Sequence, residues 1–121
     1  DIVTKDYRLI DIEQWADYVF DEGYELMPLS EVEAFVGQNH HLPGVRSAID
    51  LGRQVYTLKE MNKDFISKIE ELTLHVINQE ESIEKVKKRM KRDSDNFESL
   101  LNQFGELEKK LQGIRSKQRK K

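Results

Sequence analysis

The chain has 121 residues, enough for one domain of ordinary size, and its net charge of −3 gives no general reason to expect a nucleic-acid partner. It has no cysteine, which excludes disulfides, thiol nucleophiles and thiolate metal sites, and no apolar run long enough to suggest membrane insertion. Charged residues make up 36% and hydrophobic residues 37% of the chain, a balance typical of helices that bury only a narrow seam.

The chain changes character near Val55. Both prolines and most glycines precede this point, and residues 1–54 carry 11 acidic and 4 basic side chains, a net charge of −7. Residues 55–121 carry 12 acidic and 16 basic side chains, a net charge of +4. We therefore predict a head over residues 1–54 and a long helix with a basic tail over residues 55–121.

The head is predicted to be a small α+β unit with short strands and one short helix. Trp15–Phe20 is aromatic and β-branched and is followed by Gly23, a pattern typical of a short strand before a turn. Ser30 and Glu33 have the spacing of a capping box, which predicts a helix of about two turns starting there. His40–Gly44 is predicted to be a turn, because Pro43 disfavours helix before it. The expected head core, completed across subunits, is Trp15, Tyr18, Phe20, Leu26, Val32, Phe35 and Leu42.

The second half has a period of seven. A capping box at Thr57 and Glu60 opens it, and with Val55 at heptad position a, fifteen of the eighteen a and d positions are apolar without a change of phase. A strict seven-residue repeat predicts a left-handed coiled coil. The predicted oligomerisation seam consists of Leu58, Asn62, Phe65, Ile69, Leu72, Val76, Gln79, Ile83, Val86, Met90, Phe97, Leu100, Phe104, Leu107, Leu111 and Ile114.

The number of helices in the coiled coil is harder to read. Ile and Val at a with mixed residues at d depart from the Leu-at-d pattern of dimers, so we expect a parallel homotrimer, with a dimer as the alternative. Asn62 and Gln79 would place amides on the axis and fix the register, and the alternative is that both lie near a frayed or hydrated section and specify nothing. Residues 91–96 are poor helix formers around Asp93 at a d position. The unbroken phase favours a continuous helix there, and an antiparallel hairpin is the alternative.

Several segments in order resemble the C-terminal domain of tail-fibre-like proteins of Bacteroidetes and their phages, over about residues 15–76. That domain is similar to the peptidase S74 chaperone of phage tail spikes. The segments are Trp15–Phe20, Tyr24–Leu29, Glu31–Val36, His41–Val45, Lys59–Lys63 and Lys68–Leu74.

The resemblance implies a C-terminal trimerisation and intramolecular chaperone domain that assembles an upstream fibre of the same precursor. It also implies a place in a phage virion, on a bacterial cell surface or in secreted protein. Self-cleaving members carry a Ser-Asp start and a nearby lysine, whereas this sequence has Asp1 and Lys5 without the serine. We therefore expect no enzyme activity, and a self-cleaving peptidase with its serine upstream stays an alternative. A chain that starts at Asp1 is expected to be a fragment or a processed product.

Other candidate chemistry has simpler explanations. His40 and His41 are adjacent and lack further ligands at metal spacing, so we expect a turn and neither a metal nor a cofactor. Ser30 is explained by its capping position, which leaves no catalytic residue. The basic runs at 85–92 and 115–121 carry no interleaved aromatics, which favours a solvated helix flank over nucleic-acid binding. A coiled-coil adaptor that binds a partner helix through its e and g flanks is a further alternative.

Overall fold

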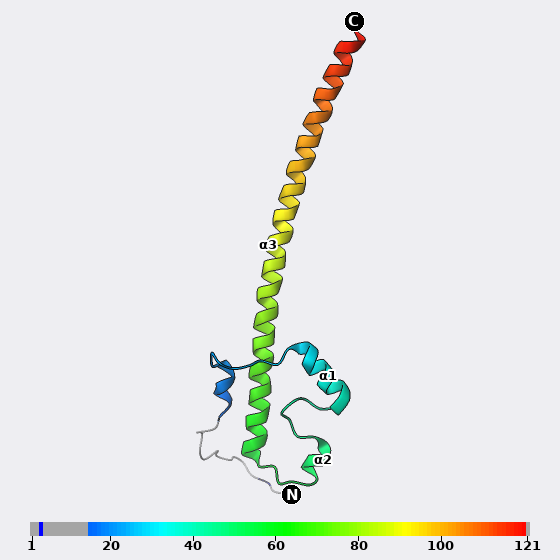
Figure 1. Ribbon diagram of the computed structural model, residues 1–121. Helices are drawn as coiled ribbons and strands as arrows, with labels where there is room; N and C mark the ends of the chain where they lie inside the picture. Colours follow the sequence, from blue (N-terminus) through cyan, green and yellow to red (C-terminus); the bar gives the residue numbers. More distant parts are fainter. Residues whose placement is uncertain (1–2, 4–14, 121) are drawn as a thin grey trace. The chain divides into compact units, whose positions relative to one another are not determined.

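The computed structural model describes residue 3 and residues 15–120, and these form four helical elements (Figure 1). They are the 3-10 helix η1 (Ala16–Phe20) and the α-helices α1 (Leu29–Asn39), α2 (Ala48–Leu51) and α3 (Leu58–Arg119). The mainly helical class and the long second-half helix are confirmed. The chain divides into two compact units, residues 1–76 and 77–121, so α3 up to Val76 lies in the first unit together with the head. Asp1 and Lys5, on which the comparison with self-cleaving proteins depends, lie outside the described residues.

The prediction of strands in the head is wrong for the residues that the structure describes, none of which lies in a strand. The aromatic run after Trp15 forms η1. A strand would place Asp17 and Val19 on the same face, whereas a 3-10 helix has three residues per turn and aligns Ala16 with Val19. Among the described residues, Ala16 and Val19 are the two buried apolar ones, 0% and 1% exposed. Burial of this i, i+3 pair explains why the helical turn replaces the strand.

Helix α1 confirms the predicted short helix, but its start differs. Its N-cap is Pro28, without a side-chain cap, and the Pro28 carbonyl accepts from the amides of Glu31 and Val32 at 2.9 and 3.0 Å. Ser30 therefore lies inside the first turn, and its predicted capping box is wrong. The helix ends at His40, which adopts the left-handed conformation with φ 59°.

The short helix α2 was not predicted. Ser47 and Asp50 form a reciprocal capping box at its start: the Asp50 amide donates to Ser47 Oγ at 3.2 Å, and the Ser47 amide donates to Asp50 Oδ2 at 3.3 Å. The hydrogen bonds from Ser47 lower the pKa of Asp50. A Ser-x-x-Asp spacing is the signal that could have located this helix.

The start of α3 confirms the capping box predicted for it. The Thr57 amide donates to Glu60 Oε2 at 2.9 Å, and the Glu60 amide donates to Thr57 Oγ1 at 3.2 Å. The bonds from Thr57 lower the pKa of Glu60. Helix α3 runs without interruption through residues 91–96, so the hairpin alternative is wrong.

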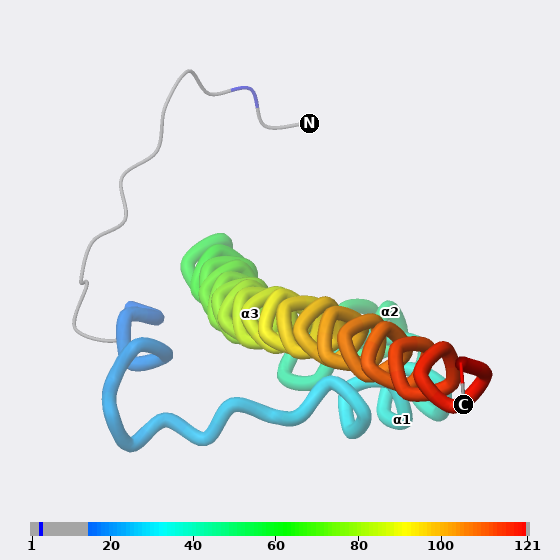
Figure 2. Tube along the Cα trace, turned by 90° about the horizontal axis from the view of Figure 1, so that it is seen from above, coloured from blue at the N-terminus to red at the C-terminus, as the bar shows by residue number. Residues whose placement is uncertain are grey.

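In the first unit, segments of the head pack on two different sides of α3. Figures 1 and 2 show η1 on one side of this part of α3 and α1 on another, joined by the extended segment between them. Figure 1 places α2 on the same side as α1. This arrangement leaves part of the α3 surface in the first unit uncovered by the described residues of the head.

Candidate oligomerisation surface and adjoining cavity

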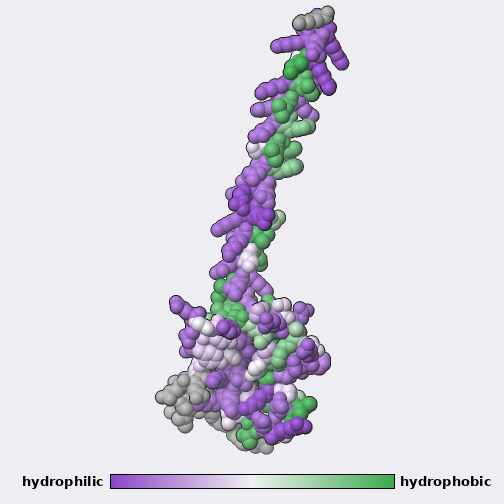
Figure 3. All heavy atoms as spheres, viewed as in Figure 1, coloured by the Kyte–Doolittle hydropathy of each residue, from purple (hydrophilic) through white to green (hydrophobic). Residues whose placement is uncertain are grey.

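The seam is exposed in the single chain. Each of its fourteen apolar residues, from Leu58 to Ile114, is between 48% and 66% exposed. In the second unit, hydrophobic side chains recur along α3 among hydrophilic ones, as Figure 3 shows. Monomeric proteins seldom expose large contiguous apolar patches, and such patches mark interaction surfaces. The apolar residues of the predicted seam are therefore exposed to solvent along α3.

The polar positions of the seam differ from one another. Asn62 is half-buried and Gln79 is exposed. Asp93, the charged d position, lies 3.9 Å from Arg89 Nε one turn earlier, with both side chains well exposed. Such an i, i+4 pair on a helix surface contributes only a few tenths of a kcal/mol, about 0.3–0.5. The helix therefore continues through this region without strong local support from side-chain pairs.

On one side of α3, η1 covers the b and f heptad positions. Lys63 Nζ lies 5.9 Å from the centre of the Tyr18 ring, and Ser67 is 7% exposed. Burial, together with the charge of Asp17 on η1, raises the pKa of Glu70. One oxygen of that carboxylate, Oε2, is buried without a hydrogen-bond partner.

On another side, the segment that leads into α1 contacts the c and g positions. Tyr24 donates a hydrogen bond to Glu71 Oε1, and Lys68 Nζ lies 2.6 Å from Glu71 Oε2. Burial, followed by the bond to Glu71, raises the pKa of the Tyr24 hydroxyl well above its usual value. Around an α-helix the heptad positions follow the order a, e, b, f, c, g, d. The two contacts thus hold the head on b, f, c and g and leave the apolar a and d residues about half exposed.

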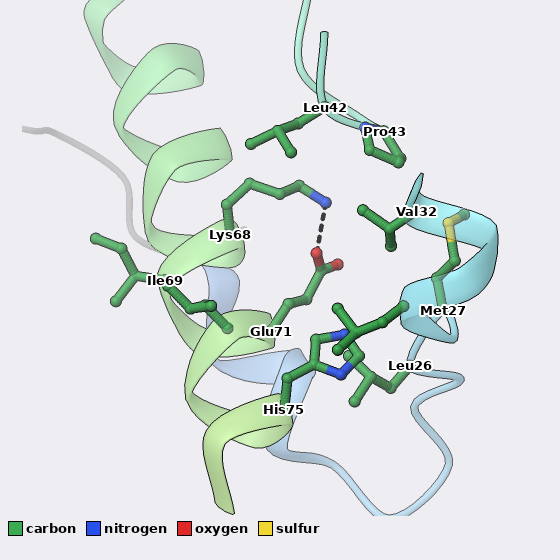
Figure 4. Close-up of a pocket in the computed structure, with 11 residues that line it drawn as sticks. Leu26, Met27, Val32, Leu42, Pro43, Lys68, Ile69, Glu71 and His75 are labelled. Atoms are coloured by element: carbon green, nitrogen blue, oxygen red, sulfur yellow. Dashed lines mark hydrogen bonds and ion pairs between the residues drawn. The ribbon is translucent and has the colours of Figure 1, made fainter. Parts of the chain in front are cut away.

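A cavity of about 390 Å³ lies between the α1 side of the head and α3 (Figure 4). Its lining is mostly apolar, and Ile69 and Leu72 of the seam form part of it. In the close-up, Lys68 and Glu71 both project from α3 toward the head segments and form their ion pair in the space between them. The full lining is Leu26, Met27, Leu29, Val32, Leu42, Pro43, Lys68, Ile69, Glu71, Leu72 and His75. The cavity therefore adjoins the seam.

Arg46 connects the turn before α2 to the start of α3. Its guanidinium donates to the Val55 carbonyl at 2.9 Å, lies 4.5 Å from the centre of the Tyr56 ring, and reaches Glu60 at 3.4 Å. Tyr56 in turn donates to Asp64 at 2.5 Å, and burial together with this bond raises the pKa of Tyr56 to about 12. These contacts fix where α3 begins relative to the head.

The seven residues predicted as head core are not fully buried in the single chain. Tyr18, Phe20 and Leu42 are exposed, and the other four are half-buried: Trp15, Leu26, Val32 and Phe35. The buried residues are small and were missed, because the strand interpretation gave the wrong face of residues 15–20. The exposed aromatic and aliphatic groups leave apolar surface of the head in contact with solvent.

The predicted turn at His40 and His41 contains local interactions. The His41 ring packs edge-on against Phe35, with ring centres 5.4 Å apart, and its Nδ1 lies 3.0 Å from the Leu42 carbonyl oxygen. Within the described part of the chain, no group of three or more His, Cys, Asp or Glu residues is placed to hold a metal ion. Nor does any helix of residues 15–120 have the length and apolar character needed to cross a membrane.

Near the C-terminus, α3 carries a shallow basic hollow. It is lined by Gln112, Arg115, Ser116, Arg119 and Lys120. Cations in the last turn of a helix interact favourably with its dipole, which accounts for part of this cluster.

No protein-family model, curated protein or solved structure gave a significant match to this chain.

Proposed function

We propose that the chain is a homo-oligomerisation domain that brings three copies together in parallel through the seam on α3. The observation that carries the proposal is the exposure of all fourteen apolar seam residues in an uninterrupted heptad phase. Fully burying a Leu or Ile side chain contributes about 1.5–3 kcal/mol. Residues that are about half exposed can therefore each contribute about 1 kcal/mol per chain when a neighbouring helix covers them.

The head supports this role because the apolar seam residues beside it, such as Phe65 and Ile69, remain about half exposed. It packs on Lys63, Ser67 and Glu70 on one side and on Lys68 and Glu71 on the other. Association through a and d positions therefore requires no displacement of the head. The head is carried at the N-terminal end of α3, so a parallel assembly brings three heads to the same level.

We infer that such an assembly would register a longer fibre-like protein. Joining three chains at one end turns the pairing of the remaining segments into an effectively intramolecular event. The resemblance of residues 15–76 to fibre-assembly domains of phages and bacterial surfaces is consistent with this role. Asn62 and Gln79 are the seam residues with the chemistry to fix the register.

A cysteine cross-link tests the parallel register. In the cysteine-free chain, Leu72→Cys places one thiol at a d position, where the same residue of a neighbouring chain lies close in a parallel, in-register coiled coil. Oxidation is expected to give a covalent dimer efficiently. Lys85→Cys, at an outward c position, is the matched control and is expected to give little product. Equal cross-linking of the two variants would contradict the parallel register.

A second candidate is an adaptor that binds a partner helix with acidic flanks. The g positions of α3 include Lys68, Arg89, Lys110 and Lys117 and no acidic residue. In a parallel homo-oligomer Lys110 would face Arg115 of the next chain, and like charges at these flanks oppose association. A monomeric purified chain that forms a stoichiometric complex with a heptad peptide bearing Glu at its e positions would favour the adaptor.

A further inference from the structure

We propose that the cavity beside α1 is completed by a second copy of this chain, whose α3 lays its Thr73 side over the opening. The inference rests on the proposed function and deepens it, since it assigns the head a direct contact with the neighbouring helix. The heptad pattern of the seam does not by itself require a contact between the head and a neighbouring helix.

The cavity and the seam form one continuous apolar surface. Ile69 and Leu72 belong to both and remain 57% and 61% exposed. On the head side of the cavity, Met27 and Leu42 are 38% and 46% exposed. Figure 4 shows Leu42 and Met27 on the head segments that face Lys68 and Glu71 of α3. A helix that packs on the seam at this level therefore lies directly beside the cavity.

Coiled-coil geometry identifies which part of the neighbour meets the cavity. The cavity is lined by both g residues at this level, Lys68 and His75. In a parallel coiled coil, g positions of one helix face e positions of the next, and Lys68 faces the e residue five positions further along, Thr73. The Thr73 hydroxyl already donates to the Ile69 carbonyl at 2.8 Å, which leaves its methyl group for contact with an apolar surface.

The chemistry of the e positions fits this assignment. At the level of the cavity they are Ile66 and Thr73, which carry no charge, whereas the flanking e positions are Lys59 and Glu80. The uncharged e positions of the neighbouring α3 therefore lie at the same height along the coiled coil as the apolar cavity.

The charges inside the cavity are already paired within the chain. Glu71 accepts from Tyr24 with one oxygen and pairs with Lys68 through the other, at 2.6 Å. The cavity thus offers an occupant mainly apolar contact, and an anionic small molecule would have to compete with Glu71 for the ammonium group. An uncharged helix face is the occupant that matches this lining.

The absence of cysteine from the chain allows a direct test. A chain carrying Leu42→Cys and a chain of different mass carrying Thr73→Cys are unfolded, mixed, refolded together and oxidised. Each chain carries a single cysteine, so a disulfide between Cys at position 42 and Cys at position 73 can only join two different copies. The matched control replaces Thr73→Cys by Lys59→Cys, at an e position 14 residues earlier and about 21 Å away along the helix. We expect at least ~10-fold more heterodimer with Thr73→Cys, because proximity raises the effective thiol concentration.

Each outcome is decisive. A Thr73-specific heterodimer supports the proposal. An efficient Leu72→Cys self cross-link without a Thr73-specific heterodimer overturns the cavity contact and leaves the oligomerisation intact. A monomer without the Leu72→Cys cross-link overturns both. Should Leu42→Cys prevent folding, Met27→Cys on the same cavity takes its place, and the same comparison applies.

Discussion

Ile77 and Ile83 provide a matched pair for testing the phase of the seam. Both are isoleucines on α3 in the second unit, and both are 48% exposed. Ile83 occupies an a position, and Ile77 occupies a b position on the outer face. Covering the exposed half of Ile83 is worth about 1 kcal/mol per chain, from the 1.5–3 kcal/mol of full burial. Ile83→Ala should therefore weaken a trimer by about 3 kcal/mol, roughly a hundredfold in the association constant.

The assay is sedimentation equilibrium of Ile83→Ala, Ile77→Ala and the unaltered chain over a range of concentrations. Alanine is at least as good a helix former as isoleucine, so neither substitution weakens the helix itself. We expect the association of Ile77→Ala to stay within about threefold of that of the unaltered chain, since about 0.5 kcal/mol is typical of surface substitutions. An equal loss in the two variants, or none in Ile83→Ala, would refute the heptad assignment.

Three further predictions concern the first unit and are measured by thermal or urea unfolding followed by circular dichroism. Thr57→Ala removes the capping box of α3 and should lower stability by about 1 kcal/mol, and an unchanged midpoint would show that the cap is dispensable. Because the pKa of Glu60 is lowered in the folded chain, its stabilisation is present above the ordinary value of 4.5 and lost as the pH falls below it. Glu60→Gln should flatten this acid dependence, and an unaltered pH profile would argue against the link. The pKa of Glu70 is raised, so the folded chain disfavours its charged form, and stability falls as the pH rises through its titration. Glu70→Gln should raise stability at pH 7 by up to about 1 kcal/mol and have no such benefit in acid, whereas a loss at pH 7 would show that the carboxylate is needed.

Much of α3 could be predicted because its signals are local and repeated. The capping box of Thr57 and Glu60 involves residues three apart, and the heptad repeat reports one face of one helix many times over. The same repeat indicated that the helix continues past Asp93, where local propensity alone suggested a break. Short segments lack this redundancy, which is why the run after Trp15 was assigned to the wrong element.

The cavity could not be predicted because it depends on contacts between distant residues. Tyr24 and Glu71 are 47 positions apart, and nothing local in either sequence segment pairs them. The same holds for the approach of Tyr18 to Lys63. The Ser47 and Asp50 capping box of α2, by contrast, is a local signal, because the two residues are three apart in the sequence.

The most direct test of the proposed assembly is the mass of the purified chain in solution, measured by light scattering at several concentrations. A parallel trimer predicts a mass about three times the 14.3 kDa of one chain, with dissociation at low concentration. A mass of one chain at every concentration would contradict oligomerisation through the seam.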